Sequence, residues 1–262
     1  NLVLYYHLND ITEKILDSNL KGKIDKIMKN VNCTKMNLSY GNFLLSRYAS
    51  QSKNHEKEFD YLLKGHQFYF ETKRKIFETE VDYWLNVLPN AKELFNFNEL
   101  NTTKDKELKP IFIIGVPRCG STLVEKVIAS GNKYIPIGEE TGIFNFYLKQ
   151  KLLRKESLSR NVENLKTTLV DIYKRKKLIS EEADYTFTDK SLDNFFYIGL
   201  IKKIFPNAKI TDCRRNVLSC IMSIFKHNLI QLPWTHNLEN IFKYFDIYYR
   251  IIEQFKKIFP NF

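Results

Sequence analysis

The second half of the chain alternates between short apolar runs and stretches whose apolar residues recur at helical spacing. The run Ile-Phe-Ile-Ile at 111–114 stops at Gly115, and the helical pattern that follows it ends before Gly131. The expected strands cover 111–114, 185–188 and 208–212, and the expected helices cover 121–130, parts of 141–178, 191–204 and 217–227. Strands separated by helices of this length predict a parallel sheet with right-handed crossovers.

Residues 1–100 carry a different pattern and are predicted to be helical. Apolar residues recur at steps of three and four over 38–48 and 59–70, and a polar stretch separates the two segments. This pair resembles one tetratricopeptide unit, with Gly41 and Tyr48 near the places that such a unit requires. A plain helical hairpin is the alternative.

A polar, charged and proline-ended stretch at 101–110 separates these two patterns. We therefore expect two segments. Residues 1–106 form an all-α, tetratricopeptide-like region. Residues 107–262 form an α/β domain, in which a P-loop-like parallel sheet is flanked by helices.

The junction after the first expected strand carries the most informative chemistry. The spacing G-x-x-x-x-G-S-T from Gly115 to Thr122 is that of a phosphate-binding P-loop. Backbone N–H groups and the dipole of the following helix converge on such a loop and favour an anion there. Ser121 stands where nucleotide hydrolases and kinases need a lysine, and Arg118 supplies the nearest fixed cation. The loop is therefore suited to a phosphate-like group.

Further cations follow the other expected strands. Lys190 and the pair Arg214-Arg215 come directly after them, so a parallel sheet would bring these cations to the edge that holds the loop. Ser223 lies eight residues after Arg215, about two helical turns. Both side chains suit a phosphate group. The alternative is that Arg215 pairs with an acid and Ser223 faces a neighbouring helix.

Glu139 and Glu140 form a second polar position, shortly after the loop helix. Adjacent carboxylates point in different directions, so we expect at most one of them to enter a site. A carboxylate in a low-dielectric pocket acts as a general base when its pKa is tuned. A helix N-cap or a solvated turn is the alternative.

The formal net charge of +11 is unevenly distributed, with +2 over residues 1–110 and +9 over 111–262. A basic half that also carries the anion loop favours an anionic ligand, although a solvated lysine-rich surface would give the same count. The basic residues are scattered among acids and belong to no recognised nucleic-acid module, so we do not expect nucleic acid as a partner.

The four cysteines show neither a C-x-x-C pair nor a histidine at metal-ligand spacing, and we expect reduced thiols and no bound metal. Cys119 is expected to be a small residue that fills the loop, and the alternative is a thiol whose pKa the anion loop lowers. No apolar run approaches the length of a membrane span, and no signal-peptide pattern is visible, which predicts a cytoplasmic location.

Five segments together resemble the sulfotransferases that use 3′-phosphoadenosine 5′-phosphosulfate (PAPS), most closely their tetratricopeptide-linked and tyrosylprotein branches. In chain order the segments are GVPRCGSTL at 115–123, GEET at 138–141, DK at 189–190, IFPNAK at 204–209 and RRNVLSCIMS at 214–223. The resemblance covers residues 108–262. It implies transfer of a sulfuryl group from PAPS, without a metal, to a hydroxyl on a peptide tyrosine or a carbohydrate. The helical region would be available for a protein partner.

The resemblance also implies a role for each motif residue. The loop that binds the 5′-phosphosulfate would consist of Val116, Pro117, Arg118, Cys119, Gly120, Ser121 and Thr122. Arg118 would supply positive charge at the transferring group, and Lys190 would stabilise the leaving phosphate. Arg215 and Ser223 would hold the 3′-phosphate. Glu140 would take the proton of the acceptor hydroxyl, with Glu139 as the second candidate, whereas His227 and His236 do not follow the loop helix as Glu140 does.

The chain departs from the family pattern at a few positions. Cys119 stands where the family often has Ser or Thr, and Asn216 where it often has Asp. The family continues beyond the point where this chain stops, at Phe262, so the resemblance predicts a missing C-terminal part. Two other functions stay open: a P-loop kinase for a small molecule, which Ser121 disfavours, and a catalytically inactive nucleotide-binding or interaction protein.

Overall fold

The computed structural model describes residues 1–12, 16–95, 108–156 and 162–259. These residues form two compact units: residues 1–81 with 224–241, and residues 82–223 with 242–262. The expected segment boundary at 106/107 borders residues outside the description and stays a prediction. The compact units divide the chain elsewhere, because a later stretch returns to the first unit.

The first unit is helical, as its apolar spacing predicts. Its N-terminal helices are α1 (Leu2–Ile11), α2 (Ser18–Met28), α3 (Lys35–Gln51), α4 (His55–Thr72) and most of α5 (Arg74–Asp82). Side chains of Asp17, Thr34 and Asn54 accept N–H bonds at the starts of α2, α3 and α4, which fixes where these helices begin. The turn Pro233–His236 belongs to the same unit.

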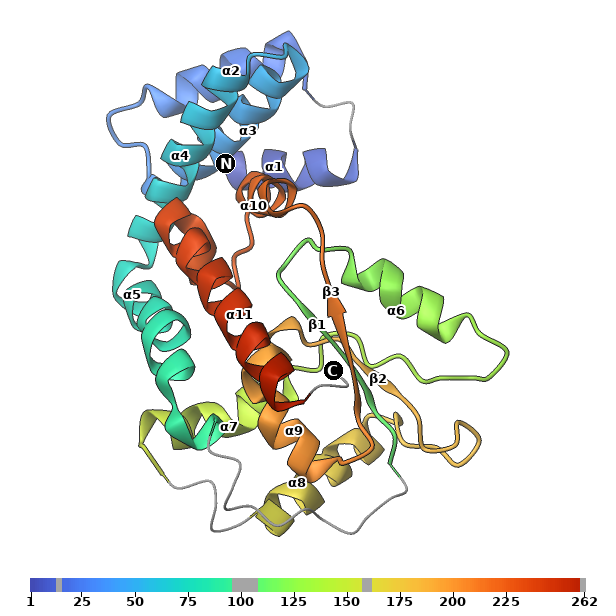
Figure 1. Ribbon diagram of the computed structural model, residues 1–262. Coiled ribbons are helices and arrows are strands. Elements are labelled where there is room, and N and C mark those ends of the chain that lie inside the picture. The colour runs from blue at the N-terminus through green and yellow to red at the C-terminus, as the bar shows by residue number, and fades with distance from the viewer. Residues whose placement is uncertain (13–15, 96–107, 157–161, 260–262) are drawn as a thin grey trace. The chain divides into compact units, whose positions relative to one another are not determined.

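The predicted helical pair corresponds to α3 and α4, which pack along one another (Figure 1). Gly41 lies where a side chain would collide with Met28 and Leu2, since a Cβ there would stand 2.5 Å from the Met28 sulfur. This close approach accounts for the glycine near the place that a tetratricopeptide unit requires. Membership of that repeat class stays a prediction.

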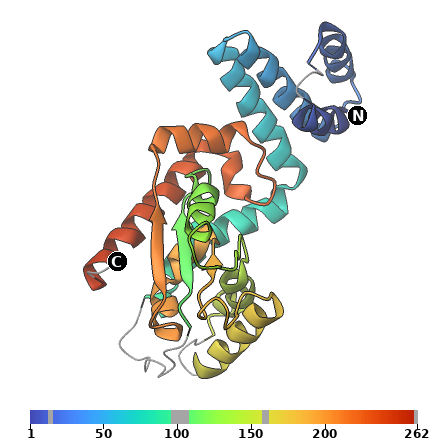
Figure 2. The same cartoon turned by 90° about the vertical axis from the view of Figure 1, so that its right-hand side faces the viewer.

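The second unit contains the predicted parallel sheet. Its strands are β1 (Ile111–Gly115), β2 (Thr188–Asp189) and β3 (Lys209–Cys213), in the order β2-β1-β3. Ile111 pairs with both Thr188 and Lys209. Two views at 90° to one another show β1 and β3 side by side (Figures 1 and 2). This sheet and its helices confirm the expected α/β class.

The helices of this unit lie between and after the strands. They are α6 (Ser121–Ala129), α7 (Ile143–Leu153), α8 (Val162–Arg175), α9 (Ile198–Ile204), most of α10 (Val217–Lys226) and most of α11 (Leu238–Ile258). Single-turn helical segments cover Tyr83–Val87, Leu88–Asn90 and Lys92–Leu94. The apolar strand β1 is buried almost throughout, and Phe112 meets Phe144 of α7 edge to face. A fully buried central strand explains why its sequence is continuously apolar.

The structure corrects three details of the sequence prediction. The strand expected over 185–188 is only Thr188–Asp189, because Asp184 and Tyr185 take left-handed backbone conformations that end a turn. The helix expected over 191–204 is a 3₁₀ segment, Leu192–Tyr197, followed by α9. The long helix α11 was not predicted, although its buried residues follow one another at steps of three and four from Ile241 to Phe255.

Candidate active site

The predicted anion loop joins β1 to α6 as expected. Arg118 and Gly120 have positive φ angles of 70° and 96°, and α6 begins directly after them at Ser121. The first N–H groups of a helix have no acceptor within the helix, so they face the loop. Gly115 is needed at the end of the strand, because a Cβ there would stand 2.8 Å from the Cys119 sulfur and 2.9 Å from the Cys213 carbonyl oxygen.

Arg118 is held against α10. Its Nε donates to Oγ of Ser223 at 3.0 Å, and its carbonyl oxygen accepts from Arg215 at 3.5 Å and from the Cys220 thiol at 3.7 Å. Three of the predicted site residues therefore lie together. The resemblance assigns Arg118 to the transferring group and Ser223 to the 3′-phosphate, and these two side chains contact one another directly.

Cys119 fills the space beneath the loop and is buried, as expected. A hydrogen bond with the thiol of Cys213 lowers the pKa of Cys119 to about 7 and raises that of Cys213. The Cys119 sulfur and the Cβ and carbonyl oxygen of Cys213 border the position where Gly115 lacks a side chain. This pairing was not predictable from the sequence, because the two cysteines are far apart in the chain and meet only where β1 pairs with β3.

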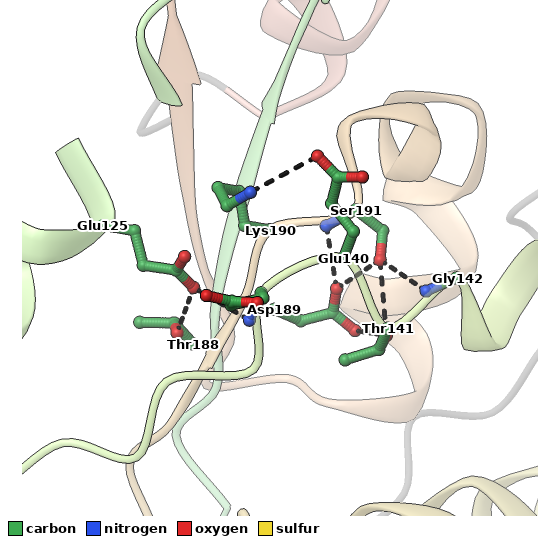
Figure 3. A network of polar contacts seen from close by, with 9 residues as sticks. Glu125, Glu140, Thr141, Gly142, Thr188, Asp189, Lys190 and Ser191 are labelled. Carbon is green, nitrogen blue, oxygen red and sulfur yellow. Dashed lines mark hydrogen bonds and ion pairs between the residues drawn. The ribbon is translucent and has the colours of Figure 1, made fainter. Parts of the chain in front are cut away.

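Lys190 and Glu140 form an ion pair at the end of β2. Lys190 Nζ lies 3.4 Å from Glu140 Oε1, and the two side chains point toward one another (Figure 3). Their exposure differs greatly: the Lys190 side chain is 5% exposed and that of Glu140 is 74% exposed. The Lys190 side chain, ammonium group included, is thus almost wholly buried, whereas the Glu140 carboxylate is largely open to solvent.

Glu125 of α6 connects the loop helix to the turn that carries Glu140. Its side chain is buried, and Oε1 accepts from Thr188 Oγ1 at 2.6 Å and from the Glu139 N–H at 3.2 Å. Thr188 Oγ1 in turn accepts from the Gly138 N–H at 3.0 Å. Figure 3 shows Glu125 reaching Thr188 from its helix. The start of the turn is therefore fixed to both α6 and β2.

Asp189 fixes the end of the same turn. Its carboxylate is fully buried and accepts from Thr141 Oγ1 at 2.6 Å, from Tyr173 OH at 2.6 Å, and from both the N–H and Oγ of Ser191 at 3.0 and 2.7 Å. Asn194 donates a fifth bond at 3.2 Å. Ser191 Oγ also accepts from the Gly142 N–H at 2.8 Å. Burial of a carboxylate is tolerable because both of its oxygens are satisfied.

The structure thus gathers the predicted residues into two groups: Arg118, Arg215 and Ser223 at the loop, and Glu140 with Lys190 at the end of β2. Glu139 has an exposed side chain, and its part in the site is through its backbone. The sequence reasoning missed Glu125 and Asp193. Burial raises the pKa of Asp193 to about 7, with Asp189 and Glu140 nearby. A polar residue at an otherwise apolar helical position was the available signal for Glu125.

Neither histidine considered in the sequence lies in this unit. His227 and His236 belong to the first unit, where His236 Nδ1 lies 2.9 Å from Nδ1 of His66. In the part of the chain that the structure describes, no group of three or more His, Cys, Asp or Glu residues is placed to hold a metal ion. Among those same residues, none of the helices combines the length and apolar character of a membrane span.

Similarity to known proteins identifies the family. Residues 110–261, more than half of the chain, match the sulfotransferase family, and the chain belongs to it. An uncharacterized protein of Aquifex aeolicus (strain VF5) is 24% identical over 240 residues, which make up 84% of this chain and 30% of that protein. The chain therefore spans less than a third of the length of this relative. No solved structure matches the chain.

Proposed function

We propose that the second unit transfers a sulfuryl group from PAPS to a hydroxyl group of a peptide tyrosine or a carbohydrate. The observation that carries this proposal is that a cation follows each of the three parallel strands at its carboxyl end, and that the loop after β1 has Ser121 in place of the P-loop lysine. Arg118 follows β1, Lys190 follows β2 and Arg215 follows β3. A ligand that carries two separate anionic groups, such as a phosphosulfate and a second phosphate, would match cations at more than one strand end.

The residues present fit PAPS in two respects. The turn through Arg118 and Gly120 leads into the start of α6, which suits a phosphosulfate group. Arg215 and Ser223 both contact Arg118, so two further donors of the kind that suits a 3′-phosphate lie next to the loop. When bound, PAPS would supply the activated sulfuryl group.

The chain's own residues would then divide the work. Arg118 would neutralise charge at the transferring group, and Lys190 would stabilise the leaving phosphate from its buried stem. Glu140, which is exposed and paired with Lys190, would accept the proton of the acceptor hydroxyl. The five sequence motifs most resemble the tetratricopeptide-linked and tyrosylprotein branches, and on that basis a protein partner would bind the helical first unit.

The first experiment measures binding of 3′,5′-adenosine diphosphate, the desulfated product, by thermal unfolding and calorimetry, with AMP and ATP–Mg²⁺ as comparison ligands. At about 100 times its dissociation constant a ligand stabilises the native state by roughly 2.7 kcal/mol. We expect stabilisation by the 3′-phosphorylated nucleotide. Stabilisation by ATP–Mg²⁺ alone would instead indicate a kinase, and no stabilisation by any of them would contradict the proposal.

A matched pair of arginine variants tests the 3′-phosphate site. Arg215→Ala should weaken binding of 3′,5′-adenosine diphosphate roughly tenfold to a hundredfold, since a bond between charged groups is lost. Arg214→Ala is the control, because it removes the same charge from the adjacent residue, which pairs with Asp212 at 2.8 Å. Equal losses in both variants, or an equal loss for AMP, would contradict the assignment.

A second pair tests the base. We expect Glu140→Gln to lower transfer of ³⁵S from labelled PAPS to tyrosine peptides and oligosaccharides by about 10²–10⁴-fold while sparing binding of 3′,5′-adenosine diphosphate. Glu139→Gln is the control, because Glu139 has an exposed side chain in the same turn. Unchanged transfer in Glu140→Gln would exclude this residue as the base.

A further inference from the structure

We infer that the buried carboxylate of Asp189 is a positioning residue, which holds the Glu140 turn and the Lys190 segment in one fixed arrangement. This inference rests on the proposed function, because the arrangement affects catalysis only if Glu140 is the base and Lys190 stabilises the leaving phosphate. It goes beyond the proposed function because Asp189 itself contacts no substrate and acts through Thr141 and Ser191.

The hydrogen bonds of Asp189 come from both segments that carry the proposed catalytic side chains. Thr141, which follows Glu140 directly, donates to Oδ2 at 2.6 Å. Ser191, which follows Lys190 directly, donates to Oδ1 through its N–H and its hydroxyl. One carboxylate therefore holds the residue after each catalytic candidate (Figure 3).

Two backbone bonds tighten the same connection. The Lys190 N–H donates to the Glu139 carbonyl oxygen at 2.8 Å, and the Gly142 N–H donates to Ser191 Oγ, which itself donates to Asp189. The turn thus runs alongside the 189–191 segment and is bonded to it on either side of Glu140. Removal of the Asp189 carboxylate would therefore loosen the segments that carry both Glu140 and Lys190.

Glu140 needs such support because its side chain is mostly in solvent. At 74% exposure, its 3.4 Å pairing with Lys190 is screened by water and does little to hold it in place. A proton acceptor must be held within hydrogen-bond reach of the proton it takes. The rigid support of the Glu140 turn is accordingly the buried carboxylate of Asp189, and not the ion pair that the exposed Glu140 side chain makes with Lys190.

The structure offers a matched pair of variants that separates positioning from stability. Thr141 and Tyr173 each donate a hydroxyl bond of 2.6 Å to the same oxygen of Asp189, but Thr141 lies in the Glu140 turn and Tyr173 lies in α8. Thr141→Val and Tyr173→Phe each remove one of these hydroxyls with little change in shape. Thr141→Ser keeps the hydroxyl and serves as the rescue.

The experiment compares the three variants by amide hydrogen exchange of the segment 138–143 and by steady-state transfer of ³⁵S from PAPS to the fastest acceptor among tyrosine peptides and oligosaccharides. In Thr141→Val we expect exchange to rise about tenfold and kcat to fall about tenfold or more, with little change in KM for PAPS. Tyr173→Phe should change neither by more than about twofold, although its unfolding midpoint falls, and Thr141→Ser should restore both values.

The outcomes distinguish this inference from the proposed function. If 3′,5′-adenosine diphosphate does not bind the wild-type protein, the proposed function fails, and the exchange measurement still shows whether Asp189 fixes the turn. If the nucleotide binds and Thr141→Val exchanges and turns over like the wild type, the positioning role is wrong. Equal effects of Thr141→Val and Tyr173→Phe on kcat would reduce Asp189 to a purely structural residue.

Discussion

The two units bury polar groups in opposite ways. In the first unit, His66 and His236 form a histidine pair within a set of aromatic rings, with Phe77 stacked on His236 and Phe225 on His66. In the second unit, Glu125 and Asp189 form a carboxylate cluster surrounded by hydroxyl and amide donors. The first arrangement is neutral and the second contains carboxylates.

The histidine pair is neutral because burial disfavours the charged imidazolium form. Burial lowers the pKa of His66 to about 4 and that of His236 to about 3. His66 Nε2 lies 2.6 Å from the Phe225 carbonyl oxygen, which can only accept, so His66 donates there. Its Nδ1 must then accept from Nδ1–H of His236. Two hydrogen bonds and the packing of the rings therefore hold the two neutral imidazoles.

A buried carboxylate needs more hydrogen-bond donors than a neutral imidazole does. Asp189 requires five donors, and most of these come from the segments that carry the proposed active site. The histidine pair joins α4 to the turn at 233–236 and serves packing. In this protein the fully hydrogen-bonded buried carboxylate lies in the proposed active site, whereas the histidines with lowered pKa values do not.

The largest expected effect tests the carboxylate cluster. Asp189→Ala removes the acceptor of five bonds and leaves buried donors unpaired, which should lower the free energy of unfolding of the second unit by about 4 kcal/mol or more. His66→Phe, which keeps a ring in the first unit, should cost about 1–3 kcal/mol. Urea denaturation measures the free energy of unfolding of both variants. A smaller loss in Asp189→Ala than in His66→Phe would contradict the view that the buried carboxylate depends more on its partners than the histidine pair does.

The next effect is a pH dependence of the first unit. Both histidines have pKa values below the unfolded value of about 6.5, so the unfolded chain binds more protons between about pH 4 and 6.5. Stability is therefore complete above pH 6.5 and falls as the pH drops below it. Between pH 7.5 and 5.5 we expect a loss of roughly 2–3 kcal/mol. Fluorescence of Trp234, buried in this unit, reports it in a Trp84→Phe background.

A control variant and a reporter confined to the first unit are both needed here. The double variant His66→Phe, His236→Leu should lose this pH dependence, and retention of the full slope would show that other groups cause it. Asp193 in the second unit acts in the opposite direction. Because its folded pKa is raised to about 7, the second unit loses stability as the pH rises from about 4 to 7.

The smallest expected effect concerns the thiols of Cys119 and Cys213 under the loop. There a hydrogen bond, and not burial, sets the pKa of Cys119. The hydrogen bond with Cys213 outweighs burial and lowers the pKa of Cys119 to about 7. Cys213→Ala should raise that pKa and slow alkylation of Cys119 by iodoacetamide at pH 7 about tenfold. Mass spectrometry of the labelled peptide gives the rate, with Cys33 as the internal reference. An unchanged rate would mean that the loop itself, and not Cys213, sets the reactivity.

Several elements were predictable because their signals are local. The strand at 111–114, the glycine-bounded turn and the helix after it follow from adjacent residues, and the structure places them within one residue of the prediction. The second strand was predicted too long, because Asp184 and Tyr185 form a left-handed turn without the glycine that normally indicates one in a sequence. The change from a 3₁₀ segment at 192–197 to an α-helix at 198–204 was not predicted, because apolar residues are frequent in both parts.

The sequence by itself determined the anion loop, the alternation that makes the sheet parallel, and the positions of Arg118, Lys190 and Arg215 after successive strands. These features depend on backbone preferences and on residues near one another in the chain. Only the tertiary structure decided that Arg118 meets Ser223, that Cys119 meets Cys213, and that Asp189 holds the Glu140 turn. Such contacts join segments distant in the sequence, and their geometry is set by strand pairing and by the need of each buried polar atom for a partner.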